Sequence, residues 1–344
     1  MNLKLKILIM SIFLIIFTNA HAQEEKQKGK FLGAKEASVP EWFYDSFLDL
    51  NEDIEEIAQE NKRLILFISQ NSCPYCHKFI NKNLKDTETR KKLDKHFKII
   101  HINLFGSKEI IDTDGKTYTE KTFAVKRNIQ FTPSLLFFDE NAKQILRLNG
   151  YMNTDKFNLA LDYIKDKKEK TITYKNYLLQ AKKNSTSNTL NQDKDLFIAS
   201  NDYSRQNTHK KMAIFFESTK CKECDITHNS LLKNKNTKAL LKKLDVYQVD
   251  LNSNEIITTP KGQNIDIQEW TQKLNISNTP TIIYFDENGD EIIRVESLFK
   301  TFHFQSIIDY VISEAYKTQK EFQRYLSNRA HKIQAQGKDV DIWK

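Results

Sequence analysis

Short apolar runs alternate with amphipathic stretches along this chain. Residues 64–69 (LILFIS) and 97–105 (FKIIHINLF) are apolar runs of the length expected for buried strands. Apolar residues at roughly helical spacing precede the first run, in residues 42–62, and a second helical segment, residues 84–97, lies between the two runs. The pattern therefore predicts a leading helix, a strand, a helical stretch and a second strand.

The pattern continues with a turn and two more strands. Residues 112–118 (DTDGKTY) contain an Asp-Gly turn and predict an inserted hairpin or loop. A short helix (119–129), two strands joined by a tight turn (131–148) and a last helix that Thr154 can cap (154–168) follow. The order is β-α-β-α-β-β-α, in which the β-α-β unit implies a right-handed parallel crossover.

The second half of the chain repeats this order. Residues 211–232 (KMAIFFESTKCKECDITHNSLL) match residues 63–84 (RLILFISQNSCPYCHKFINKNL), and residues 278–295 match residues 131–148. Strands, turns and a Thr-Pro pair keep a spacing of 147 or 148 residues throughout. Because chance similarity is a poor explanation for so many features in step, we interpret the chain as an internal duplication of one domain.

The fold class that follows is α/β, with two tandem domains. Each domain is predicted to be a small mixed sheet with helices on both faces, in three layers. The polar run from Lys182 to Asp195 marks the connection between the domains. We expect a signal peptide (1–22), a polar tether (23–40), a first domain with a helical extension (41–183), a linker (184–194), a second domain with a helical extension (195–331) and a polar tail (332–344).

The N-terminus has the pattern of a secretory signal. Lys4 and Lys6 precede an apolar stretch (ILIMSIFLIIF), and Ala20-His21-Ala22 is a small-residue cleavage site. An uncleaved membrane anchor is the alternative, although the stretch is short against the roughly 20 residues that a spanning helix needs. We expect cleavage after Ala22, no stable membrane insertion afterwards, and an oxidising exterior compartment for the mature chain.

Net charge and cysteine usage limit the kinds of function that the chain can have. The formal net charge is +8, but lysine is spread along the chain, which favours a solvated basic surface. No arginine-rich stripe or recognition motif supports binding to nucleic acid. The chain has four cysteines, and all four lie in two CxxC pairs. This usage indicates two reactive sites, because a disulfide-stapled secreted domain scatters more cysteines along its sequence.

The first CxxC pair follows a predicted strand and opens a predicted helix. Pro74 lies where a first-turn proline is tolerated, since that position has no helical N–H partner. A sulfur at the helix N-terminus feels the positive end of the macrodipole, which favours the thiolate of Cys73. Cys76, one turn further, is within reach of a mixed disulfide on Cys73. The layout predicts a redox dithiol, with a fixed structural disulfide as the alternative.

The second pair, Cys221 and Cys224, has the same spacing but different neighbours. Lys220 and Lys222 favour the Cys221 thiolate by their charge, whereas Glu223 opposes it. We expect a second redox-active site, with a structural or degenerate disulfide as the alternative.

Two other kinds of site share these residues. Cys73 to His77 reads CPYCH, formally the attachment signature of c-type haem, but its repeat has Asp225 in place of the histidine. Two CxxC pairs can also form a four-cysteine zinc site, which would require the two domains to dock face to face. Because each pair belongs to its own complete domain, we predict no metal and no cofactor.

The strand, the CxxC motif and the downstream Thr-Pro before a hairpin together resemble the thioredoxin superfamily. Residues 41–181, with WFYDSFLDL, CPYCHK and LNGYMNTDKFNLALDYI, resemble SoxW-like periplasmic thioredoxins, and residues 195–331 resemble the same family less closely. The resemblance implies two thioredoxin folds and a thiol–disulfide oxidoreductase of the periplasm. The alternative function is a chaperone or adaptor that uses these folds as peptide-binding surfaces.

The family resemblance also implies roles for individual residues. Cys73 would attack a substrate disulfide and Cys76 would resolve the mixed disulfide, with Cys221 and Cys224 as the corresponding pair. The substrate surface would comprise Pro74, Tyr75, Thr132, Pro133, Thr279 and Pro280, with both Thr-Pro peptides cis. The implied partners are oxidised periplasmic proteins and a membrane thiol electron donor of the DsbD/CcdA type.

The sequence departs from the family pattern at two places in each domain. Thioredoxins carry a tryptophan just before the first cysteine, where this chain has Ser72 and Lys220. They also carry a buried aspartate six residues before that cysteine, where this chain has Phe67 and Phe215. The resemblance therefore leaves the proton acceptor for the resolving cysteine unassigned.

Overall fold

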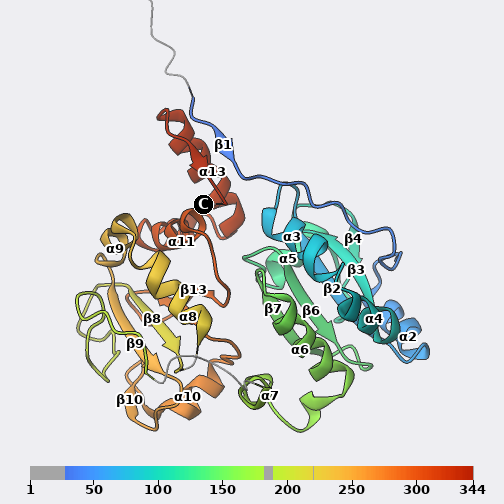
Figure 1. Cartoon of the computed structure of the whole chain (residues 1–344), viewed down its shortest axis with the longest axis horizontal. Helices are drawn as coiled ribbons and strands as arrows, with labels where there is room; N and C mark the ends of the chain where they lie inside the picture. The colour runs from blue at the N-terminus through green and yellow to red at the C-terminus, as the bar shows by residue number, and fades with distance from the viewer. Residues whose placement is uncertain (1–27, 182–188, 220, 344) are drawn as a thin grey trace, which may run out of the picture.

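A computed structural model describes residues 28–181, 189–219 and 221–343, so the expected signal peptide lies outside the described residues. Figure 1 shows two domains side by side, each built on its own four-stranded sheet. In the first sheet the strand order is β3-β2-β6-β7. β2 and β3 are parallel, and the other neighbouring pairs are antiparallel. This arrangement confirms the predicted mixed α/β class. The strands are β2 (Arg63–Ser69), β3 (Phe97–Asn103), β6 (Ser134–Phe138) and β7 (Gln144–Asn149).

Helices cover both faces of the first sheet. Every residue of β2 is buried, and residues 64–68 are all apolar, as expected for a strand that is covered on both faces. Alternate residues of β2 belong to two different apolar clusters, one on each face of the sheet. One face packs on α2 (Leu50–Gln59) and α5 (Glu120–Lys126). The other packs on α3 (Pro74–Lys78), the π-helix η1 (Phe79–Asn83), α4 (Thr87–His96) and α6 (Thr154–Lys165). The predicted insert is the hairpin of β4 (Glu109–Ile111) and β5 (Thr117–Thr119).

The second domain repeats the first. Its strand order, β13-β12-β8-β9, matches β7-β6-β2-β3. The strands are β8 (Met212–Glu217), β9 (Asp245–Asp250), β12 (Thr281–Phe285) and β13 (Glu291–Val295), with a hairpin of β10 (Ile256–Thr258) and β11 (Asn264–Asp266). The short helix α8 (Lys222–Ile226) leads into η3 (Thr227–Leu231). One face packs on η3, α9 (Lys235–Leu241) and α11 (Thr301–Ile312), and the other on α10 (Ile267–Lys273).

The first helix is shorter than its sequence pattern predicts. It begins at Leu50 because the Asp49 side chain caps it, accepting hydrogen bonds from the main-chain N–H groups of Asn51 and Glu52. Leu48, just before the cap, has a φ of 67°. Trp42 and Phe43 precede the helix as coil and pack against the core.

The two ends of the described chain pair with each other. β1 (Phe31–Leu32), within the expected tether, runs parallel to β14 (Val340–Asp341), within the expected polar tail. α13 (Phe322–Ala335) also extends into that tail, and Figure 1 shows it beside β1. Val340 and Ile342 are buried with Ala330 of α13, so a small apolar cluster fixes a segment whose composition is mostly polar. Three further short helices are η2 (Lys168–Lys170), α7 (Tyr174–Ala181) and α12 (Ala315–Thr318).

Buried side chains join the two domains. One contiguous apolar cluster contains Tyr75 and Phe131 of the first domain together with Phe299 and Phe322 of the second. Among the residues that the structure describes, no helix has both the length and the apolar character needed to span a bilayer.

Candidate redox site

The first CxxC pair lies at the start of α3, as its sequence predicts. Cys73 is the N-cap residue, Pro74 occupies the first turn, and the main-chain N–H of Cys76 points at Cys73 Sγ from 3.1 Å. Cys73 and Cys76 form a disulfide with a Cα–Cα distance of 5.3 Å. A helix N–H aimed at the sulfur stabilises the thiolate once the disulfide is reduced.

The Thr-Pro segment lies directly against this disulfide. Cys73 Sγ is 3.4 Å from Thr132 Oγ1 and 3.8 Å from the Thr132 carbonyl oxygen. The Thr132–Pro133 peptide is cis, as the family resemblance implies, and the Pro133 carbonyl accepts a hydrogen bond from the N–H of Gly150 at 2.8 Å. The fold therefore brings together residues that are about 60 positions apart in the sequence.

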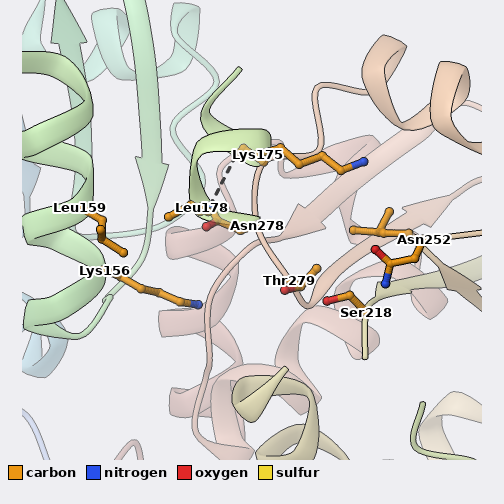
Figure 2. Close-up of a pocket in the computed structure, with 10 residues that line it drawn as sticks. Lys156, Leu159, Lys175, Leu178, Ser218, Asn252, Asn278 and Thr279 are labelled. Carbon is orange, nitrogen blue, oxygen red and sulfur yellow. Dashed lines mark hydrogen bonds between the residues drawn. The ribbon is translucent and has the colours of Figure 1, made fainter. Parts of the chain in front are cut away.

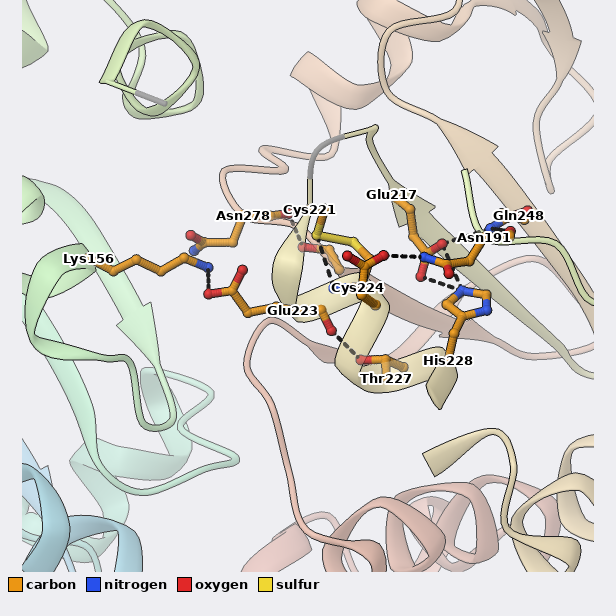
Figure 3. The surroundings of a disulfide bond; sticks show 12 residues. Lys156, Asn191, Glu217, Cys221, Glu223, Cys224, Thr227, His228, Gln248 and Asn278 are labelled. Atoms are coloured by element: carbon orange, nitrogen blue, oxygen red, sulfur yellow. Dashed lines mark hydrogen bonds and ion pairs between the residues drawn. A yellow bond between two sulfur atoms is a disulfide. The ribbon is translucent and has the colours of Figure 1, made fainter. Parts of the chain in front are cut away.

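The second pair repeats this local geometry. Cys221 is the N-cap of α8, the N–H of Cys224 lies 3.1 Å from Cys221 Sγ, and the Cα–Cα distance across the disulfide is 5.2 Å. The Thr279–Pro280 peptide is also cis. Figure 3 shows Glu223 reaching across to Lys156 of the first domain, with an ion-pair distance of 3.0 Å. Because Lys156 offsets the charge of Glu223, the carboxylate opposes a Cys221 thiolate less than its sequence position suggests.

The sequence motifs did not indicate that the carboxylate of Glu217 is buried beside the second site. Glu217, at the end of β8, is fully buried, and its carboxylate lies 3.0 and 3.1 Å from His228 Nε2 and 2.7 Å from Gln248 Nε2 (Figure 3). It lies on the same side of the strand as Phe215, because side chains two residues apart share a face. Phe215 holds the position where the family has its acid, so Glu217 places a carboxylate one strand repeat closer to the CxxC motif. The available signal was a charged residue ending the apolar run MAIFFE.

The corresponding place in the first domain holds a neutral pair. Ser69 is the counterpart of Glu217, and its Oγ lies 2.8 Å from His101 Nε2. Burial lowers the pKa of His101 to about 4, with a smaller contribution from Lys108. The imidazole is therefore uncharged at neutral pH, and the two sites differ in the polar groups beneath their helices.

Residues of the second domain and of the C-terminal tail cover the first CxxC pair. The Tyr75 ring contacts Phe299, His303 and Trp343 edge-on, with ring centroids 5.9, 5.1 and 5.2 Å away. The N–H of Lys300 donates a hydrogen bond of 2.9 Å to Tyr75 Oη. Tyr75 is only 6% exposed, and this burial raises its pKa. A side chain expected at the substrate surface is thus enclosed by the protein itself.

Pockets lie near the second CxxC pair, although Cys221 and Cys224 are themselves buried, at 2 and 1% exposed. Figure 2 shows a pocket between Leu159 and Leu178 of the first domain and Ser218, Asn278 and Thr279 of the second. A neighbouring pocket is lined by Tyr151, Met152 and Lys156 on one side and by Glu223, Thr279 and Pro280 on the other. The predicted substrate residues of this site therefore border cavities instead of packed side chains.

The arrangement of the four sulfurs suits disulfide chemistry. Each cysteine is bonded to the other member of its own CxxC pair. Within residues 28–181, 189–219 and 221–343, no three or more His, Cys, Asp or Glu side chains gather in a way that could hold a metal ion.

Comparison with a protein-family model agrees with this architecture. The family model described as "Thioredoxin-like domain" matches residues 50–165 and again residues 203–312, together well over half of the chain. No curated protein matches the chain. Solved structures that it resembles include a thioredoxin-fold protein from Helicobacter pylori (18% identity, 41% of this chain and 93% of that one, TM-score 0.36). Others are a thioredoxin from Thermus thermophilus (16%, 40% and 87%, 0.27) and the oxidised DsbD C-terminal domain from Neisseria meningitidis (13%, 34% and 88%, 0.25). The chain belongs to the thioredoxin-like domain family and carries two copies of that domain.

Proposed function

We propose that the protein is an exported thiol–disulfide oxidoreductase that reduces protein disulfides through Cys73 and Cys76. The observation that carries the proposal is the position of Cys73 Sγ, which meets the N–H of Cys76 on one side and Thr132 on the other. The helix N-terminus stabilises a thiolate there, and the Thr132 main chain offers an edge to which an extended substrate segment adds as a strand.

The reaction is a pair of thiol–disulfide exchanges. The Cys73 thiolate attacks one sulfur of a substrate disulfide, forming a mixed disulfide and releasing the other substrate sulfur as a thiolate that takes up a proton. The Cys76 thiolate then attacks Cys73 Sγ, which forms the Cys73–Cys76 disulfide and releases the second substrate thiol. Two electrons pass to the substrate, so a dithiol donor must reduce the enzyme before the next cycle.

The proposed setting follows from the sequence. The signal-like N-terminus supports a periplasmic location, with oxidised periplasmic proteins as substrates and a membrane thiol donor of the DsbD/CcdA type as the source of electrons. The likeness of the first domain to SoxW-like thioredoxins supports the same assignment. We propose that Cys221 and Cys224 form a second redox-active pair, because this site repeats the geometry of the first.

Reduction of insulin by dithiothreitol tests the proposal. The wild-type protein should accelerate the reaction, Cys73→Ser should lose the contribution of the first site, and a Cys73→Ser/Cys221→Ser variant should fall to the rate of dithiothreitol alone. A Cys221→Ser variant is the matched control for the second site. If the wild type is no faster than the double variant, the protein is not an oxidoreductase of this kind.

The reduction potential decides the direction of the reaction. A value for Cys73–Cys76 near that of thioredoxin, about −270 mV, supports a reductase, and a value near −120 mV supports an oxidase. Potentials well below about −300 mV at both sites would mark structural disulfides and favour a chaperone or adaptor instead.

A further inference from the structure

Three separate segments of the first domain form the surface around Cys73, and all three are buried. These are the CxxC dipeptide with Tyr75, the segment before the cis peptide with Phe131 and Thr132, and the loop after β7 with Gly150. Tyr75, Phe131 and Thr132 are 6, 3 and 4% exposed. All three segments flank Cys73, and the contacts that enclose them come from the second domain.

The segment between β13 and α11, residues 296–303, provides the central contacts. The Phe299 ring lies 4.9 Å from Phe131 and 5.9 Å from Tyr75, measured between ring centroids, and is itself only 7% exposed. The Lys300 N–H is bonded to Tyr75 Oη. Gly150 makes the close approach possible, because a Cβ at this residue would lie 2.7 Å from Ser297 Oγ. Its φ of 79° also favours glycine.

The start of α13 closes the other side. The Phe322 ring lies 5.4 Å from Phe131, and the Phe322 N–H donates to Gln130 Oε1 at 3.1 Å. Gln323 Nε2 donates to the Gln130 carbonyl at 3.0 Å, and Gln323 Oε1 accepts from Gln70 Nε2 at 2.9 Å. Hydrogen bonds to main-chain and side-chain groups therefore hold the second domain beside the cis peptide, in addition to aromatic packing.

The duplicated domain provides an internal comparison. The residues that correspond to Tyr75 and Phe131 are Glu223 and Asn278, which are polar and only partly buried. Met152 corresponds to Phe299, yet it lines a pocket beside Pro280 instead of filling the surface. Each domain thus places the loop after its last strand against the CxxC surface of the other domain. At the first site aromatic side chains fill the space between these segments, and at the second site they do not.

We propose that residues 296–303 and the start of α13 act as a built-in occupant of the substrate surface of the first CxxC pair. A protein substrate reaches Cys73 only after this cover lifts, and the aromatic surface of Tyr75 and Phe131 then binds a large apolar side chain of the substrate in place of Phe299. The proposal rests on the proposed oxidoreductase function. It adds that the second domain controls the access of substrates to Cys73.

Access to the Cys73 thiol tests the cover directly. The full chain is reduced, freed of reductant and exposed to N-ethylmaleimide or to a maleimide carrying a polyethylene-glycol chain. Mass spectrometry of the Cys73 peptide gives the rate with each reagent. In the wild type the bulky reagent should react much more slowly than the small one. Phe299→Ala should raise the bulky-to-small ratio by about tenfold, the effect expected for the loss of a central aromatic anchor.

Two further variants make the result decisive. Gln323→Ala removes hydrogen bonds to the first domain only, so it should also raise the ratio, and it decides the test if Phe299→Ala does not fold. Phe47→Ala, at a fully exposed phenylalanine, is the matched control and should leave the ratio at the wild-type value. An unchanged ratio in both cover variants, or an equal rise in the control, overturns the proposal. The labelling needs no turnover, so its outcome is independent of whether insulin is reduced.

Discussion

Glu217→Gln is the most informative substitution for the buried polar group under the second site. Glu217 is fully buried, and its two carboxylate oxygens face His228 Nε2 and Gln248 Nε2. A glutamine of the same shape has only one acceptor oxygen. If that oxygen stays at the Oε2 position, where it faces both Gln248 Nε2 and His228 Nε2, the new amide N–H₂ replaces Oε1 beside the same histidine nitrogen.

The size of the effect follows from the contacts that are lost. A buried donor left without a partner costs about 1–3 kcal/mol. We therefore expect Glu217→Gln to destabilise the second domain by about 2 kcal/mol, the middle of this range, which with a urea slope of about 2 kcal/mol/M lowers the unfolding midpoint by about 1 M.

Urea unfolding of the full chain, followed by circular dichroism, measures this change. The duplication supplies a matched control in Ser69→Ala, which removes one hydrogen bond to His101 at the corresponding place in the first domain. That control should cost about 1 kcal/mol. A midpoint for Glu217→Gln that moves no further than the midpoint for Ser69→Ala would refute the reasoning, because a buried carboxylate with three contacts would then contribute no more than a single hydroxyl.

Two further predictions concern stability. Asp112 has a fully buried carboxylate that bonds Lys126 and Arg127, so Asp112→Asn should cost about 3–5 kcal/mol, whereas Asp114→Asn at the partly exposed partner of Lys126 should cost under about 1 kcal/mol in the same urea assay. Burial lowers the pKa values of His101 and His303 to about 4, so the unfolded chain binds protons below about pH 6.5 that the folded chain does not. Their joint effect should be a loss of stability as the pH falls from about 6.5 to 4, of up to about 3 kcal/mol each. Burial raises the pKa of Asp53 to about 6, which acts in the opposite direction over the same range, so the test compares variants. A pH slope in urea titrations that persists unchanged in a His303→Phe variant would contradict this reasoning.

Local sequence patterns were enough to predict the fold and the local geometry of both CxxC pairs. Neighbouring residues determine the apolar run of β2 and the tight turn before β7. The duplicated spacing can likewise be read directly from the sequence. The same holds for the start of α3, because Cys73 and the N–H of Cys76 that bonds it are only three residues apart. Such short-range preferences leave a periodicity or a motif that can be recognised without a structure.

The surroundings of those sites depend on contacts between segments that are far apart in the chain. Phe299 lies more than 200 positions from Tyr75, and nothing in its own neighbourhood distinguishes it from any other buried aromatic residue. Glu217 acquires its role because β8, η3 and β9 bring His228 and Gln248 to it. β1 and β14 pair although both lie in stretches of polar composition. Contacts of this kind depend on how segments far apart in the chain pack, within one domain or between the two, and side-chain packing leaves no fixed spacing in the sequence.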